Sequence, residues 1–320
     1  MSSLLIASFY FDHQRKQYSL TLLANKNLLI GFFLAIFGTL LFSLKSIFIK
    51  FLYQQGLDAD AVLVLRMALA LPIYLMILLW LLRHKVERKA LNIPTVRSIF
   101  LLGFLGYYFA SLLDLMGLEL ISAQLERLSL FTYPFMVALI GYFLFNEALT
   151  RRLIIALIIS YSGLFLVMVQ ELQLTGNNVI QGVSLVLGSA LSFAFYVLFS
   201  RPFIKQLGSK LFTSIAMIAS CLFGLLHGAI LIDFTQLVIT NTAWLWLTML
   251  VIFSTVIPSF MMTEAIHRIG PAQTGIVGML GPIFTIGLAV YILGEPFTLI
   301  IALGVLLVII GVMSLVIYKK

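Results

Sequence analysis

Ten long apolar runs follow one another along this chain, and only short connections separate them. A helix that crosses a bilayer needs about 20 mostly apolar residues, and each run is close to that length. None of the connections could hold a folded soluble domain. We therefore predict ten membrane spans, at residues 28–53, 60–82, 97–117, 120–145, 150–169, 179–200, 210–232, 243–265, 271–293 and 297–318.

The composition favours lipid as the solvent of this chain. Hydrophobic residues make up 62% of it and charged residues 10%, whereas soluble domains have roughly 45–50% and about 25%. In lipid, only helices and closed barrels satisfy their own backbone, and the sequence lacks the alternating pattern of barrel strands. The expected fold is an all-α polytopic membrane protein.

Lysine and arginine predict the orientation, because cytoplasmic loops carry an excess of both. With the N-terminus inside, the predicted outer loops contain neither residue. The predicted inner segments carry Arg15, Lys16, Lys26, Arg83, Lys85, Arg88, Lys89, Arg97, Arg151, Arg152, Arg201, Lys205, Lys210, Arg268, Lys319 and Lys320. We therefore expect both termini to be cytoplasmic, with residues 1–27 as an N-terminal tail. This placement accounts for the net charge of +8 without a nucleic-acid partner.

Two segments of the chain, 131–167 and 279–315, match each other without gaps at an offset of 148. The matches at this offset are Pro134 with Pro282, Glu147 with Glu295, and Gly163 with Gly311. At an offset of 151, the starts of the two halves match as Gly31 with Gly182, Phe42 with Phe193, and Lys50 with Arg201. These matches predict an internal repeat.

Each predicted repeat holds five spans, and an odd number places the two repeats in opposite orientations. We expect the first repeat at 28–169, an external linker at 170–178, and the second repeat at 179–318. Inverted repeats are typical of secondary transporters, because two similar halves can open toward either face of the membrane.

A proline followed thirteen residues later by a glutamate, and then by a glycine, occurs in both halves of the chain. With the ten spans, this pattern resembles the EamA-type transporters of the drug/metabolite transporter superfamily, over about residues 28–318. The resemblance implies a bacterial inner-membrane carrier, usually an exporter of small metabolites or amino acids. It does not imply a particular substrate.

Ionisable residues within spans are costly in lipid and therefore face protein or water. Six such residues require partners: Lys45, Arg66, Asp114, Glu126, Arg127 and Glu264. From depth and sign, we predict that Asp114 pairs with Arg127 and that Glu126 pairs with Arg66. No partner is identified for Lys45, and Glu264 is expected to pair with His267 or Arg268. The charges either lock helices together or include a group that binds substrate or a proton.

Tyrosines and prolines are the other candidates for a transport pathway. Tyr107, Ser111 and Asp114 recur at helical spacing and predict one polar stripe. Tyr107, Tyr108, Tyr133 and Tyr196 either line a central cavity or serve as packing. Pro134 and Pro282 each remove a backbone donor in mid-span, as a fixed kink or as a device that exposes carbonyls to the cavity.

Charged residues at the ends of spans have a structural interpretation. Glu147 and Glu295 are expected to cap the fifth and tenth spans, because an acid stabilises a helix N-terminus. Lys50 and Arg201, at span ends, are expected to extend their charged groups to the membrane surface.

The predicted function is secondary transport, with a passive channel or facilitator and a non-transporting scaffold as alternatives. The sequence contains no HExxH, GxSxG or acidic metal motif, so no enzyme is expected. Its single cysteine, Cys221, excludes an internal disulfide framework and a cysteine-rich metal site. No cofactor is expected. The partners to consider are a small-molecule substrate, the lipid bilayer, a proton or other coupling ion, and a second copy in a homodimer.

Overall fold

The computed structural model describes residues 2–83, 92–145, 150–176, 178–235 and 237–317, and for 2–26 the backbone alone. All regular elements in these ranges are helical. The first half contains α1 Ser2–Gln54, α2 Ala59–Leu82, α4 Ile93–Gly103, the π-helix η1 Phe104–Phe109, α5 Ala110–Leu120, α6 Ala123–Leu130, α7 Tyr133–Phe145 and α8 Arg151–Thr175. The second half contains α9 Asn178–Leu207, α10 Ser209–Leu231, α11 Asn241–Val251, the π-helix η2 Ile252–Val256, α12 Ile257–Gly278, α13 Leu280–Leu293 and α14 Leu299–Ile317.

Eight helical stretches in the described ranges are long and apolar enough to cross a membrane. They coincide with the first eight predicted spans. The ninth and tenth predicted spans correspond to shorter apolar helices, Leu280–Leu293 and Leu299–Ser314. The predicted connection at 266–270 is helical, because α12 continues through it to Gly278. The chain is thus a multi-pass α-helical membrane protein.

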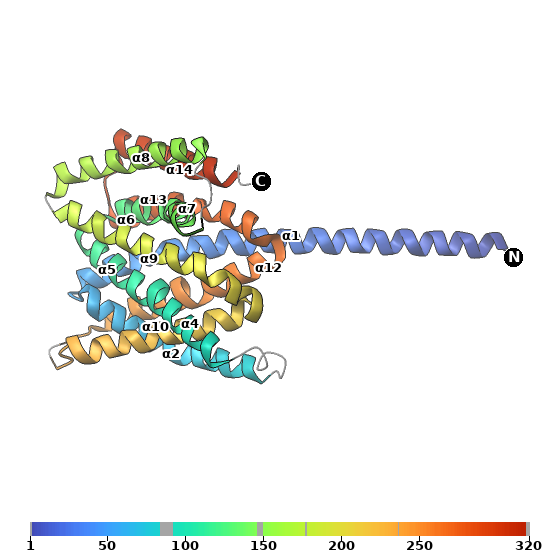
Figure 1. Cartoon of the computed structure of the whole chain (residues 1–320), viewed down its shortest axis with the longest axis horizontal. Helices are drawn as coiled ribbons and strands as arrows, with labels where there is room; N and C mark the ends of the chain where they lie inside the picture. The colour runs from blue at the N-terminus through green and yellow to red at the C-terminus, as the bar shows by residue number, and fades with distance from the viewer. Residues whose placement is uncertain (1, 84–91, 146–149, 177, 236, 318–320) are drawn as a thin grey trace.

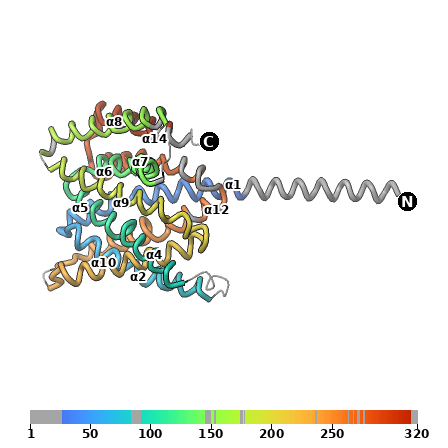
Figure 2. Tube along the Cα trace, in the orientation of Figure 1, coloured from blue at the N-terminus to red at the C-terminus, as the bar shows by residue number. Residues whose placement is uncertain are grey.

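Helices from the two halves of the chain pack against each other throughout the bundle. Figures 1 and 2 show α8 beside α14 at one edge and α2 beside α10 at the other. Between these edges, α1 packs against α12 and α13, while α9 packs against α5 and α7. The core therefore consists of contacts between segments that are far apart in sequence.

Both predicted prolines lie beside an interruption between two helices within a predicted span, and not inside one continuous helix. The fourth span breaks at Phe131–Thr132, and Pro134 lies in the first turn of α7. A second break, at Met279, precedes α13, whose first turn contains Pro282. Proline is tolerated in a first turn because its missing N–H would have no helical acceptor there. At the first break, the Thr132 hydroxyl donates to the Ser129 carbonyl at 2.7 Å.

Two π-helical segments widen the third and eighth spans, and the sequence analysis did not anticipate either of them. In η1, the Leu105 carbonyl accepts from the Ala110 N–H and from the Ser192 hydroxyl of α9, the latter at 2.8 Å. In η2, the Thr255 hydroxyl donates to the Leu250 carbonyl at 3.1 Å. A π-bulge inserts one residue into a helix and therefore rotates everything beyond it by roughly 100°.

Glycines bring α8 and α14 into backbone contact. A Cβ on Gly163 would lie 2.4 Å from the Gly304 carbonyl oxygen, and one on Gly311 would lie 2.7 Å from the Ala156 carbonyl oxygen. Small residues allow such close packing between helices in a membrane. The glycine pair predicted from the repeat, Gly163 and Gly311, therefore lies in one helix interface.

We expect Gly163→Ala to lower the free energy of unfolding by about 1–3 kcal/mol, because overpacking forces backbone apart. Thermal unfolding in detergent would measure the change. Gly287→Ala is the matched control, since a Cβ at Gly287 meets nothing within 4 Å. Equal stability of the two variants would contradict the close contact.

Candidate functional site

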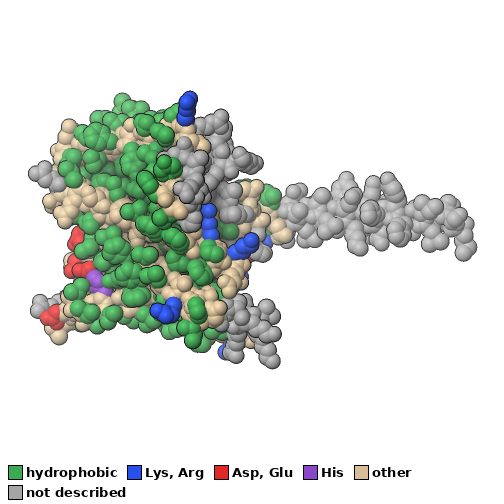
Figure 3. Space-filling model, viewed as in Figure 1, with side chains coloured by type: hydrophobic (Ala, Val, Ile, Leu, Met, Phe, Trp, Pro, Cys, Tyr) green, Lys and Arg blue, Asp and Glu red, His purple; other side chains and the backbone are tan. Residues whose placement is uncertain are grey.

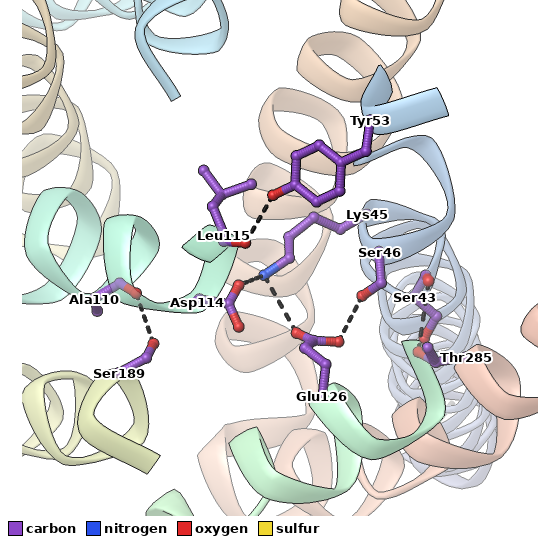
Figure 4. A network of polar contacts seen from close by, with 10 residues as sticks. All are labelled: Ser43, Lys45, Ser46, Tyr53, Ala110, Asp114, Leu115, Glu126, Ser189 and Thr285. Atoms are coloured by element: carbon purple, nitrogen blue, oxygen red, sulfur yellow. Dashed lines mark hydrogen bonds and ion pairs between the residues drawn. The ribbon is translucent and has the colours of Figure 1, made fainter. Parts of the chain in front are cut away.

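Lys45 of α1 lies between two buried carboxylates. Its ammonium forms an ion pair with Asp114 Oδ2 of α5 and lies 3.9 Å from Glu126 Oε1 of α6. Asp114 is 3% exposed and Glu126 is fully buried, whereas the Lys45 side chain retains 19% exposure. Figure 4 shows the three side chains converging from three helices. We call these residues the ion triad (Lys45, Asp114 and Glu126). Its electrostatic contacts connect α1 with α5 and α6, which lie far from α1 in the sequence.

Hydroxyl groups of α1 connect the ion triad to neighbouring helices. The Ser46 hydroxyl donates to Glu126 Oε2 at 2.8 Å. One turn earlier, the Ser43 hydroxyl donates to the Gly281 carbonyl of α13 at 3.1 Å, and Thr285 donates to the Ser43 carbonyl (Figure 4). A polar face of α1 thus contacts the broken regions of both the fourth and the ninth predicted spans.

The predicted ion pairs of Asp114 with Arg127 and of Glu126 with Arg66 are absent among the described residues. Both acids pair with Lys45 instead, the one residue for which the sequence analysis identified no partner. The prediction failed because depth and sign do not reveal which helix lies between the others. Lys45 had one useful signal, its position well inside an apolar run.

Tyrosines form a cluster at the junction of the third, fourth and sixth predicted spans. Tyr196 of α9 donates a hydrogen bond to the Tyr107 hydroxyl at 3.0 Å. Phe193 stacks on Tyr196 and meets the edge of Tyr133, with ring centroids 5.6 Å and 5.3 Å apart. Three of the four predicted tyrosines therefore lie together, in what we call the tyrosine cluster (Tyr107, Tyr133, Phe193 and Tyr196).

Tyr108, the fourth tyrosine, lies elsewhere. Its hydroxyl is 2.9 Å from His227 Nδ1, and His227 Nε2 is 3.2 Å from Asp60 Oδ1. This chain of contacts joins α2, η1 and α10 near the ends of the helices.

The predicted polar stripe of the third span is split between two neighbours. Tyr107 bonds to α9, whereas Asp114 bonds to α1. Ser111, between them, is half-buried and has no side-chain hydrogen bond to any described residue. The π-segment at 104–109 lies within the stripe, so a regular helical projection does not hold across it.

Two arginines lie near the ion triad without direct partners. Arg66 of α2 is 5% exposed, and its Nε has no hydrogen-bond partner among the described residues. Arg127 of α6 also has a buried Nε without a partner, and its guanidinium lies against Gly281. Asp114 exerts the largest attraction on Arg66, although no hydrogen bond joins them.

Two glutamates hold the N-terminus of α6. Glu171 accepts from the Ser122 N–H at 2.6 Å, and Glu295 accepts from the Ala123 N–H at 2.7 Å. Beside them, at the end of α5, the Lys50 ammonium donates to the Ile121 carbonyl at 2.6 Å. Glu295 is a helix cap as predicted, but it caps α6 and not the tenth span, which follows Glu295 in the chain. A carboxylate stabilises a helix N-terminus because the first N–H groups of the helix lack helical acceptors. Glu147 lies outside the described residues.

Glu264 of α12 is separate from the ion triad. Its Oε1 accepts from Arg268 Nε at 2.7 Å, one helical turn away, and both side chains are about one-third exposed. One of its two predicted partners is confirmed. Among the predicted charged residues, Lys45, Asp114 and Glu126 are thus brought together, Arg66 and Arg127 adjoin them, and Glu264 lies apart.

A bundle of apolar helices with ionisable side chains buried at its interfaces is typical of polytopic membrane proteins, in which such groups often mark substrate or ion pathways. The chain belongs to the EamA-like transporter family, whose sequence pattern matches residues 29–169 and again residues 180–317. This confirms the resemblance predicted from the paired proline, glutamate and glycine positions.

Named relatives extend over most of the chain. Uncharacterized transporter YcbK of Bacillus subtilis (strain 168) is 30% identical over 86% of this chain and 88% of its own length. Uncharacterized transporter sll1319 of Synechocystis is 25% identical over 93% and 96%. A solved crystal structure with 16% identity matches 92% of this chain with a TM-score of 0.61 and shows a shared fold. The protein is therefore a membrane transporter of this family.

Proposed function

We propose that this protein is a secondary transporter that exports small metabolites or amino acids across the bacterial inner membrane by alternating access. Ten spans in two inverted five-helix repeats would form it, with the pathway along the ion triad and the tyrosine cluster. The observation that carries the proposal is the ion triad itself. Two carboxylates buried at span depth share one partly exposed ammonium, and such groups typically mark a substrate or ion pathway.

Several features support the inverted repeat. The family pattern matches the chain twice. The π-segments begin at Phe104 and Ile252, and the helix breaks fall at 131–132 and 279, so both recur at the offset of 148. The packing of α1 against α12 and α13 has a counterpart in that of α9 against α5 and α7. A two-fold axis in the membrane plane would generate this pairing.

The ion triad has features that a carrier needs. Asp114 Oδ1 and Glu126 Oε1 are buried and have no hydrogen-bond partner among the described residues. Each could accept a proton or a donor from a solute as the helices move. At the predicted outer end, Glu295 ties the second half to the start of α6, in a contact that would have to release during opening.

The surface charges support cytoplasmic termini. On the face shown in Figure 3, Lys and Arg lie toward the side from which α1 leaves the bundle, and Asp, Glu and His lie toward the opposite end. Hydrophobic side chains cover much of the area between. The positive-inside rule places the basic end in the cytoplasm.

A labelling experiment tests this orientation. The single native cysteine, Cys221, is fully buried, so introduced cysteines should react alone with a membrane-impermeant maleimide. In intact cells, we expect labelling of Asp58→Cys and Asp233→Cys, and of Arg201→Cys only after the membrane is opened. The reverse pattern would invert the assignment.

Counterflow in proteoliposomes tests transport. A resistance screen with toxic metabolite analogues first identifies a substrate, and the purified protein is then reconstituted with that substrate inside. A carrier should accelerate entry of labelled substrate by exchange, which a passive channel or a scaffold cannot do. Loss of export after an uncoupler would indicate proton coupling. Absence of exchange with every compound that the screen identifies would refute the proposal.

A further inference from the structure

Arg66 is a buried cation that forms no ion pair among the described residues, and its Nε has no hydrogen-bond partner there. It lies among Tyr53, Tyr74 and Cys221, none of which carries a compensating charge at neutral pH. The one acid that acts strongly on it, Asp114, has its Oδ2 occupied by Lys45. A guanidinium buried without hydrogen bonds is unfavourable, because its lost hydration is not replaced.

Arg127 of α6 also has a buried Nε without a hydrogen-bond partner among the described residues, although its side chain as a whole is partly exposed. Arg127 follows Glu126 of the ion triad directly in the chain and is within electrostatic reach of Tyr133 of the tyrosine cluster. Its guanidinium rests against Gly281, where even a Cβ would approach Nη2 to 2.5 Å. A larger residue at 281 would displace it.

Neither Arg66 nor Arg127 forms an ion pair with an acid among the described residues, so each guanidinium is free to bind an anionic group of a solute. Arginine favours carboxylates in particular, since its planar fork can donate two parallel hydrogen bonds to the two oxygens.

We propose that the substrate carries a carboxylate and that Arg66, assisted by Arg127, is the residue that binds it. This inference rests on the proposed transport function, because it concerns the substrate of that transport. The binding itself can be measured without transport. The tyrosine cluster beside Arg127 would contact the remainder of the molecule.

The first test uses the purified protein in detergent without ligand. Removing a buried cation that has an acidic partner destabilises a protein, because the partner loses its counter-charge. Replacing a buried cation that has no partner with an apolar residue is neutral or stabilising. We expect Arg66→Met to melt at the same temperature as the wild type or higher, while Lys45→Met melts lower. A fall for Arg66→Met as large as that for Lys45→Met would show a structural partner and overturn the proposal.

The second test measures ligand-induced stabilisation. Three matched pools serve as probes: short aliphatic and aromatic monocarboxylates, the corresponding amides and the corresponding amines. We expect only the carboxylates to raise the melting temperature. The apparent affinity should fall roughly tenfold to a hundredfold in Arg66→Gln, as for a lost hydrogen bond to a charged group. Arg127→Gln should give a smaller loss, and Arg201→Gln, an exposed arginine of α9, should leave affinity unchanged.

The outcomes separate this inference from the transport proposal. The carboxylate assignment would be overturned if the amides or amines stabilise the protein, if no pool does, or if the carboxylates stabilise Arg66→Gln as much as the wild type. In that case, counterflow of another solute would still support the transport proposal. Carboxylate binding that depends on Arg66, without counterflow of any bound compound, would support the assignment and contradict transport. If Arg66→Gln fails to purify as a monodisperse protein, Arg66→Lys provides the comparison. Arg66→Lys keeps the charge but loses the planar fork, so its affinity for the carboxylates should fall below that of the wild type.

Discussion

Lys45→Met is expected to destabilise the protein by about 3–5 kcal/mol, because it leaves two buried carboxylates without a cation. Asp114 and Glu126 both lie within 4 Å of the Lys45 ammonium, and neither has another basic partner among the described residues. The measurement is thermal or denaturant unfolding of the purified protein in detergent. Export in cells should also be lost, since the variant removes the cation that contacts both acids.

Arg201→Met is the matched control for this experiment. Arg201 is an exposed cation of α9, so the same loss of charge removes no buried pair, and surface ion pairs contribute about 0–1 kcal/mol. A melting temperature of Lys45→Met equal to that of Arg201→Met would mean that the two carboxylates do not depend on Lys45.

The spans were predictable because the membrane imposes a length and a polarity on each of them. Eight of the predicted spans coincide with long apolar helices. The ends of α12 were not predictable, since the chain from Ile257 to Gly278 stays helical through Gly270 and Pro271. A local breaker signal gives a bias and not a boundary. The prolines at 134 and 282 were located correctly in mid-span, and the structure adds that each lies in the first turn of a helix that follows a break.

The members of the candidate site were predictable, whereas their pairing was not. Apolar surroundings made Asp114, Glu126 and Arg127 conspicuous in the sequence, as they did Lys45. Which acid meets which base depends on the rotation of each helix about its axis. The π-segment in the third span shifts that rotation between Tyr107 and Asp114, and no residue type in FLGYYF announces it. Pairing across the bundle therefore required the three-dimensional arrangement.

The two halves share their architecture, but the charged residues of the ion triad come from the first half. At the offset of 151, Lys45 aligns with Tyr196, and at 148, Asp114 aligns with Met262 and Glu126 with Thr274. The charged members of the ion triad therefore have uncharged counterparts in the second half, where Tyr196 belongs to the tyrosine cluster. We interpret this asymmetry as the reason why one pathway can present both an ionic and an aromatic surface to a solute.

Removing all three charges of the ion triad together separates its structural role from its function. In the variant Lys45→Met/Asp114→Asn/Glu126→Gln, no buried charge loses its partner, because every member becomes neutral at similar volume. Replacing a buried ionic group by neutral side chains is often neutral or stabilising, so we expect most of the stability lost in Lys45→Met to return. The Ser46 hydroxyl can still donate to the amide oxygen at position 126.

Counterflow should nevertheless fall to the level of liposomes without protein in this triple variant. Alternating access requires groups that exchange partners between states, and a neutral site holds neither a proton nor an ion. The assay is reconstitution of the triple variant beside the wild type at equal protein density, with the substrate from the resistance screen. Full counterflow in a stable triple variant would show that the ion triad only locks α1, α5 and α6 together. Stability that stays as low as in Lys45→Met would instead mean that the packing of these helices requires the charges themselves.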